Sequence, residues 1–184
     1  MSDKKNAIEA VVNFLNDDSK RILLVRGYDN DAKLKVVLSC LNKEFDRGII
    51  RTSSMSDISD FINRAFDKKL LPDSIKSTTT YQLGRMTVNI NSYVTSTRTN
   101  PLGNESCFTL FFPVQTVLDD PKRYQNFLIE LEKVKSRKVI LITTNDWSID
   151  KWDIASKVDE VYFYSVENDN PRIMANLRRN GEIV

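Results

Sequence analysis

The chain has 184 residues, of which 28% are charged and 41% hydrophobic, and its net charge is +2. This composition is typical of a folded domain with a sizeable core, and the balanced charge excludes a strong general attraction to DNA or acidic membranes. The chain has no histidine, which excludes Ser-His-Asp triads, Cys-His dyads and His-ligated metal sites. Any enzymatic activity would have to use carboxylates, Lys, Arg, hydroxyls or Mg²⁺, and we predict no catalytic residue and no protein metal site.

The apolar segments indicate a cytoplasmic protein. Cys40 and Cys107 lie within apolar runs, where reduced core cysteines of a cytosolic protein are expected. The N-terminal residues lack the apolar region of a signal peptide, and no run approaches the ~18–20 apolar residues of a membrane span. We expect a single domain over residues 1–184 that makes no membrane contact.

The first part of the chain alternates helical and strand patterns. Apolar residues at helical spacing predict helices, and short apolar runs predict buried strands. A helix is predicted to start after Ser56, which is a plausible N-cap. The predicted elements are a helix at 6–17, a strand at 21–27, a helix at 31–45, a strand at 48–54 and a helix at 57–66.

Residues 76–106 differ from the rest, since nearly half of them are Ser, Thr or Asn. Apolar residues alternate at Met86, Val88 and Ile90, which predicts a half-exposed strand. Pro101 and Gly103 mark a loop further on. We interpret the segment as a polar β-strand and loop insertion that projects from the core and contacts a partner.

The second half returns to regular alternation. It predicts a strand at 107–114, a helix at 121–134, a strand at 138–145, a short helix at 148–158, a buried strand at 160–166 and a helix at 170–180. Strands that alternate with helices imply crossover connections and a parallel sheet. The predicted fold is therefore α/β, with a mainly parallel five-stranded sheet flanked by helices.

The loop after the first strand fits the pattern G-x-x-x-x-A-K-L, from Gly27 through Ala32 and Lys33 to Leu34. A phosphate-binding P-loop reads G-x-x-x-x-G-K-[ST] in the same setting between a strand and a helix. A near-match of this kind also arises in an ordinary strand-loop-helix in which an Asp caps the helix. Both interpretations stay open at this point.

The order of elements, together with this loop, resembles the nucleotide-binding core of the AAA+ branch of P-loop ATPases. The resemblance covers roughly residues 6–180, with 76–106 as an insertion and without the full helical lid domain of that family. It implies that Gly27 and Lys33 match the P-loop glycine and lysine, and that Asn145 matches the polar sensor residue at the end of a later strand. These three residues form the predicted relic nucleotide site.

The chain departs from the family at the residues that handle Mg²⁺ and water. Leu34 replaces the metal-binding Ser/Thr, and Pro113 and Val114 follow the apolar run at 108–112, where the resemblance implies two acidic residues. Asp29 and Asp31 would repel phosphate oxygens. We therefore expect no ATP hydrolysis and no resident cofactor, which describes a degenerate P-loop domain or pseudo-ATPase.

Three functions follow as expectations. The leading one is a non-hydrolysing interaction module in a larger assembly of DNA processing, mobile elements or defence, whose protein partner is an active ATPase or a further copy of the chain. The first alternative is a nucleotide-binding switch or weak ATPase that uses ATP and Mg²⁺. The second is a nucleic-acid-binding protein that uses segment 76–106.

The residues predicted to contact a partner or nucleic acid are aromatic rings and arginines, because stacking and phosphate contacts need those types. In segment 76–106 they are Tyr81, Arg85, Tyr93 and Arg98. Trp147 and Trp152, near the end of a strand, are a further candidate contact, although a core position suits them as well.

Overall fold

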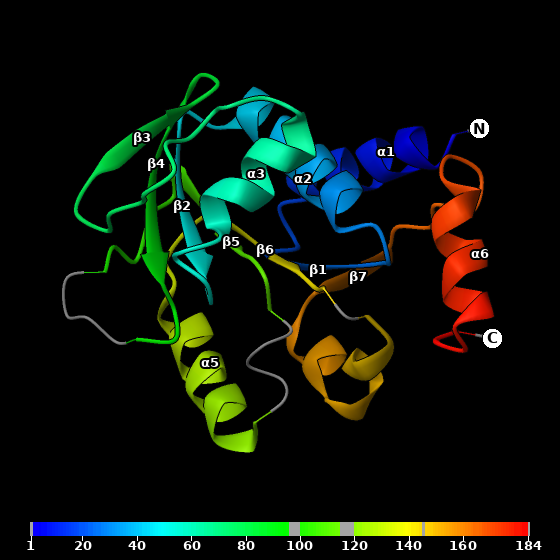
Figure 1. Ribbon diagram of the computed structural model, residues 1–184. Helices are drawn as coiled ribbons and strands as arrows, with labels where there is room; N and C mark the ends of the chain where they lie inside the picture. Colours follow the sequence, from blue (N-terminus) through cyan, green and yellow to red (C-terminus); the bar gives the residue numbers. More distant parts are fainter. Residues whose placement is uncertain (1, 96–99, 115–119, 145, 184) are drawn as a thin grey trace.

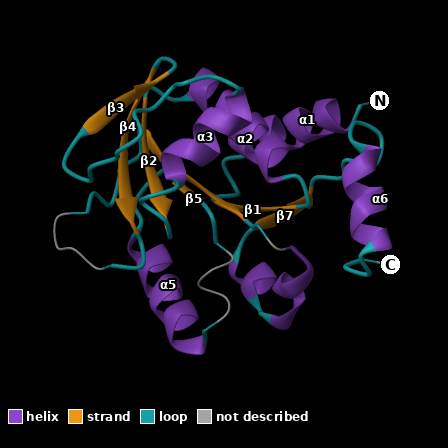
Figure 2. Ribbon diagram, viewed as in Figure 1, coloured by secondary structure: helices purple, strands orange, loops and turns teal. Residues whose placement is uncertain are grey.

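The computed structural model describes residues 2–95, 100–114, 120–144 and 146–183, and for Trp147 only the backbone. A central sheet separates two layers of helical structure (Figure 1). Helices α1, α2 and α3 cover one face, whereas α5 and two short 3₁₀ turns cover the other (Figure 2). Each face carries its own apolar core, one around Leu23, Ile50 and Phe108 and the other around Leu24, Phe111 and Leu141.

The sheet has seven strands in the order β3-β4-β2-β5-β6-β1-β7. All neighbouring pairs are parallel except β3 and β4, which form an antiparallel hairpin. The strands are β1 (Ile22–Arg26), β2 (Arg47–Thr52), β3 (Thr80–Leu83), β4 (Met86–Ser92), β5 (Cys107–Phe111), β6 (Lys138–Ile142) and β7 (Glu160–Phe163).

The helices follow the predicted periodicity, and side chains cap three of them. Ser2, Asp29 and Asp120 each accept a backbone N–H in the first turn of the helix that follows. The helices are α1 (Asp3–Asn16), α2 (Asn30–Glu44), α3 (Ile58–Phe66), α5 (Pro121–Lys133) and α6 (Pro171–Arg179), with 3₁₀ turns at Asp146–Lys151 and Ile154–Lys157. In the described part of the chain, no helix is both long and apolar enough to cross a membrane.

The predicted mainly parallel α/β sheet is confirmed, but the number of strands was wrong, because the sheet has seven strands and not five. The two additional strands come from segment 76–106. Met86, Val88 and Ile90 are buried, as the alternation indicated, and β4 pairs in parallel with β2 from Arg47↔Thr87 onward. The hairpin therefore extends the sheet instead of projecting from it. Its apolar face packs into the core that lies between the sheet and helices α1, α2 and α3.

Three local predictions need correction. The strand β7 is not fully buried, because it lies at the sheet edge and leaves Val161 and Phe163 42% and 43% exposed. The segment predicted as a short helix over 148–158 forms two 3₁₀ turns instead. Helix α3 starts at Ile58, and its N-cap is Asp57 rather than Ser56.

Candidate functional site

The candidate site lies at the carboxyl ends of the neighbouring strands β1 and β6. From β1 the chain crosses through α2 to β2 toward one edge of the sheet, whereas from β6 it crosses through the 3₁₀ turns to β7 toward the other edge. Open α/β sheets bind ligands in the crevice at the point where two adjacent strands send their connections in opposite directions. Gly27 and Lys33 lie at this switch point, on the connection from β1 to α2 and in the first part of α2.

Gly27 directly follows β1 and has φ = +136°, a conformation that L side chains rarely adopt. A Cβ atom at this position would lie 2.5 Å from the carbonyl oxygen of Tyr164. The glycine is therefore required by the close approach of another backbone segment of the same domain. A bound phosphate is not needed to explain it.

Asp29 occupies the start of α2 in the manner of an ordinary helix cap. Its Oδ1 accepts the backbone N–H of Ala32 at 3.0 Å, and the helix begins at the next residue, Asn30. The connection from the strand to the helix is therefore short, and the carboxylate sits at the positive end of the helix where an anion would bind. Asp31 pairs with Arg64 of α3 at 3.2 Å.

Lys33 lies one turn into α2, and its side chain is fully buried. Its Nζ donates to the carbonyl oxygens of Gly27 and Thr143, both at 2.5 Å, and lies 3.5 Å from Thr143 Oγ1. Burial lowers the pKa of Lys33 to about 7, although the nearby carboxylates of Asp146 and Asp29 act in the opposite direction. The buried amine thus links the residue that follows β1 to the residue that follows β6 by hydrogen bonds.

Asp146 completes this cluster and was missed by the sequence analysis. Only 1% of it is exposed, and its carboxylate accepts from Gly27 N at 3.2 Å, from Thr143 Oγ1 at 3.1 Å and from Arg26 Nε and Nη2 at 3.2 and 3.1 Å. Arg26 also pairs with the exposed Asp150 at 3.1 Å. We call Arg26, Gly27, Lys33, Thr143 and Asp146 the β1–β6 cluster.

The end of β5 carries no acidic side chain. Phe112, Pro113 and Val114 follow the strand, and all three are buried. The backbone N–H of Val114 donates to Ile142 O at 3.1 Å, which packs this segment against the end of β6. Leu34, in the place of a metal-binding hydroxyl, is also a core residue that is 1% exposed. Leu34 and the residues that follow β5 are therefore parts of the buried core.

The residues of segment 76–106 predicted to contact a partner are dispersed. The Arg85 guanidinium donates to the Asn42 and Lys43 carbonyl oxygens at 2.5 and 2.7 Å, and the Tyr81 hydroxyl accepts from Lys76 N at 2.8 Å. Tyr93 is buried, packs against the rings of Phe111 and Phe127, and donates to Pro113 O. A contact role for Tyr93 is incompatible with this burial, and the structure brings no stacking platform together among these three residues.

Two further predicted residues, Asn145 and Arg98, lie outside the described residues, as does the side chain of Trp147. The ring of Trp152 packs on Tyr124 with the ring centroids 4.9 Å apart. It also borders the core on the α5 face of the sheet, so the core interpretation fits this tryptophan best. Among the described Cys, Asp and Glu side chains, no group of three is placed to hold a metal ion.

Comparison with known proteins supports the fold alone. No protein-family model matches the chain, and no curated protein matches its sequence. Among solved structures, it is similar to the large terminase of a thermophilic bacteriophage, with a TM-score of 0.55 and 9% sequence identity. The match covers 94% of this chain and 49% of the terminase, so the chain spans about half the length of that protein.

Proposed function

We propose that this chain is a P-loop-like domain that does not hydrolyse nucleotide and that serves as an interaction subunit of a larger assembly. The observation that carries the proposal is the position of the Lys33 amine. It is hydrogen-bonded to the Gly27 and Thr143 carbonyl oxygens inside the domain, where the lysine of a working P-loop would reach phosphate oxygens.

Two further features support the same proposal. The first-turn N–H of Ala32 already binds the Asp29 carboxylate, so a phosphate would have to displace an internal anion. Hydrolysis also needs groups that hold Mg²⁺ and orient water, and the end of β5 offers Phe112, Pro113 and Val114 instead. The Lys33 amine and the Ala32 N–H are thus bound to groups of the domain itself, although the buried Asn30 Oδ1 at the start of α2 has no hydrogen-bond partner among the described residues.

The partner and the biological setting of this assembly are proposed only as classes. In this proposal the partner is a protein, either an active ATPase or a further copy of the chain, and the setting is DNA processing, a mobile element or defence. The similarity to a bacteriophage terminase, at 9% identity, bears on the fold only and does not choose among these settings. Affinity purification followed by mass spectrometry should recover one stable companion in fixed proportion to this chain.

The direct test of the nucleotide site uses the native chain. Equilibrium dialysis with labelled ATP and Mg²⁺ should show no saturable binding, and a turnover assay should show no hydrolysis above background. Because neither measurement needs a variant, a folding defect cannot imitate the result. Saturable binding competed by unlabelled ATP would refute the non-binding part, and turnover lost in Lys33→Ala would refute the whole proposal.

The nucleotide-binding switch is a second candidate, and the location of Lys33 at the strand switch point favours it. In this alternative, ATP would draw the amine away from Gly27 O and Thr143 O. A ligand that binds only the folded state at 100 times its Kd stabilises that state by about 2.7 kcal/mol. Saturating ATP should then raise the thermal midpoint clearly, whereas the leading proposal expects no change.

A further inference from the structure

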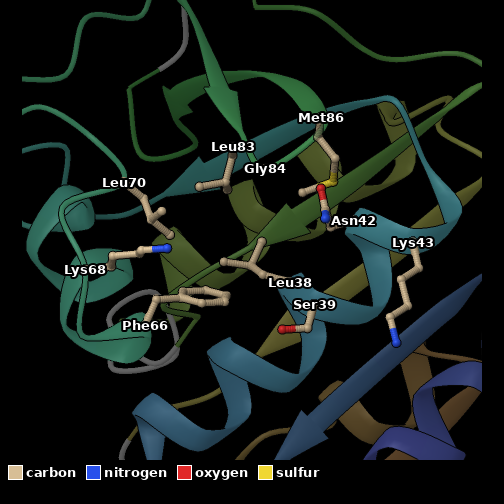
Figure 3. Close-up of a pocket in the computed structure, with 10 residues that line it drawn as sticks. All are labelled: Leu38, Ser39, Asn42, Lys43, Phe66, Lys68, Leu70, Leu83, Gly84 and Met86. Carbon is tan, nitrogen blue, oxygen red and sulfur yellow. The ribbon is translucent and has the colours of Figure 1, made fainter.

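A cavity of about 310 Å³ lies far from the β1–β6 cluster, at the opposite end of the parallel strands. It is bounded by the second half of α2, by the chain that follows α3 and by the turn between β3 and β4. Figure 3 shows its apolar lining, to which all three walls contribute. The apolar side chains are Leu38, Phe66, Leu70, Leu83 and Met86.

The wall after α3 is held in place by Asn63. Its Oδ1 accepts the backbone N–H groups of Leu70 and Leu71 at 2.8 and 2.9 Å, and its Nδ2 donates to Leu71 O at 3.0 Å. The backbone N–H of Lys68 donates to Asn63 O at 3.0 Å. This segment therefore keeps a defined shape at the mouth of the cavity.

The hairpin turn is clamped to the C-terminal end of α2. Arg85 donates from its backbone N–H to Asn42 Oδ1 at 2.9 Å and from its guanidinium to Asn42 O and Lys43 O. Gly84 has φ = +64°, and a Cβ there would lie 2.5 Å from Asn42 Oδ1. The cavity is thus preformed, which reduces the entropy lost when a ligand binds.

The charged side chains of the lining are both cationic. Lys43 and Lys68 line the cavity, no Asp or Glu does, and the described residues place no carboxylate within ion-pair distance of either ammonium group. In Figure 3 the Lys68 ammonium lies between Leu70 and Phe66, whereas that of Lys43 points away, and both lysine residues are exposed to solvent. The neighbouring Lys69 differs, because it pairs with Asp73 at 3.2 Å and does not line the cavity.

We propose that this cavity binds a small amphiphilic carboxylate, a hydrocarbon chain or ring that carries one carboxylate group. The hydrocarbon would lie against the apolar lining, and the carboxylate would accept a charge-assisted hydrogen bond from Lys68 Nζ. Ligand pockets of this size are mostly apolar with a few polar groups that fix orientation, and Ser39 adds a hydroxyl to this lining. This site is independent of the proposed nucleotide chemistry and of the partner interaction.

The test uses sodium decanoate as the probe and the full chain labelled with ¹⁵N. Titration should give saturable amide shifts at Leu70, Leu83 and Gly84, whereas decyltrimethylammonium should not shift them. Lys68→Gln should weaken decanoate binding about threefold, the loss expected for one ion pair of an exposed lysine. The matched control Lys69→Gln should bind like the native chain.

A second variant tests the location independently of charge. Ser39→Trp should fill the cavity and abolish binding, while its thermal unfolding midpoint reports that the domain is folded. Absence of saturable shifts in the native chain would overturn the proposal. So would equal weakening by Lys68→Gln and Lys69→Gln, or undiminished binding in a folded Ser39→Trp variant. If acetylated Leu-Asp peptides bind while decanoate does not, the occupant is a protein segment and the small-molecule assignment is wrong.

Discussion

Replacing Lys33 should change how the stability of the domain depends on pH. In the folded chain, burial lowers the pKa of this amine from 10.5 to about 7. At pH values between about 7 and 10.5, the Lys33 amine is protonated in the unfolded chain and deprotonated in the folded chain. Raising the pH through this window therefore favours the folded state, and the stabilisation is lost as the pH falls through about 7.

The size of the effect follows from the pKa difference. One pKa unit corresponds to about 1.4 kcal/mol, so the free energy of unfolding should rise by about 2.5 kcal/mol between about pH 7.5 and about pH 9.5 on account of this one group. In Lys33→Met the group is absent, and this part of the pH dependence disappears. Met fills a similar volume, although the Gly27 and Thr143 carbonyl oxygens lose their donor.

The assay is urea unfolding of the native chain and the variant at four pH values across this range. The quantity of interest is the difference between the two free energies of unfolding, because other titrating groups cancel in it. Lys35→Met, which alters an exposed lysine two residues further along α2, is the control and should leave the pH dependence unchanged. A difference that stays flat with pH would show that Lys33 remains an ammonium held by the two carbonyl groups, and the argument from burial would fail.

Two other predictions concern the β1–β6 cluster and are measured by urea unfolding at neutral pH. Gly27→Ala should destabilise the domain by about 3 kcal/mol, because the new Cβ would lie 2.5 Å from Tyr164 O and the residue would be strained at positive φ. The control Gly181→Ala is also at positive φ but has open space around it, so it should lower the free energy of unfolding by only about 1 kcal/mol. Asp146→Asn should lower the free energy of unfolding by about 3 kcal/mol, because Asp146 is the buried ion-pair partner of Arg26. Asp150→Asn removes an exposed partner of the same arginine and should change it by no more than about 0.5 kcal/mol. Equal losses for the two glycine variants, or for the two aspartate variants, would contradict the structure.

Local patterns predicted the elements better than their pairing. The apolar run of β1 and the helical spacing of α2 depend on nearby residues, and both elements were found where the sequence placed them. The alternation in β4 correctly predicted one buried face. Its pairing with β2 joins residues about 40 positions apart, as in Gly48↔Val88, and no local signal encodes that contact. The strand count was therefore too low.

The candidate site shows the same division. Lys33 was found because a short motif contains it, and the alternative of a capping Asp in that loop matches the observed bond from Ala32 N to Asp29. Asp146 was missed because its partners Arg26 and Gly27 lie about 120 residues earlier. An aspartate after an apolar strand looks like any turn residue until the fold places it beside β1. Nothing in the sequence indicated that the lysine donates to carbonyl oxygens.

The two residues that match the P-loop motif have sufficient reasons to be present without a nucleotide. Gly27 is required by the approach of Tyr164 O, and Lys33 joins the ends of β1 and β6. The match at these positions therefore does not discriminate between a working site and a structural one. Discrimination has to come from positions that only nucleotide chemistry would require, namely a hydroxyl after Lys33 and acids at the end of β5. Leu34 and Val114 stand at these places as buried core residues, and their burial supports the proposal that the domain does not hydrolyse nucleotide.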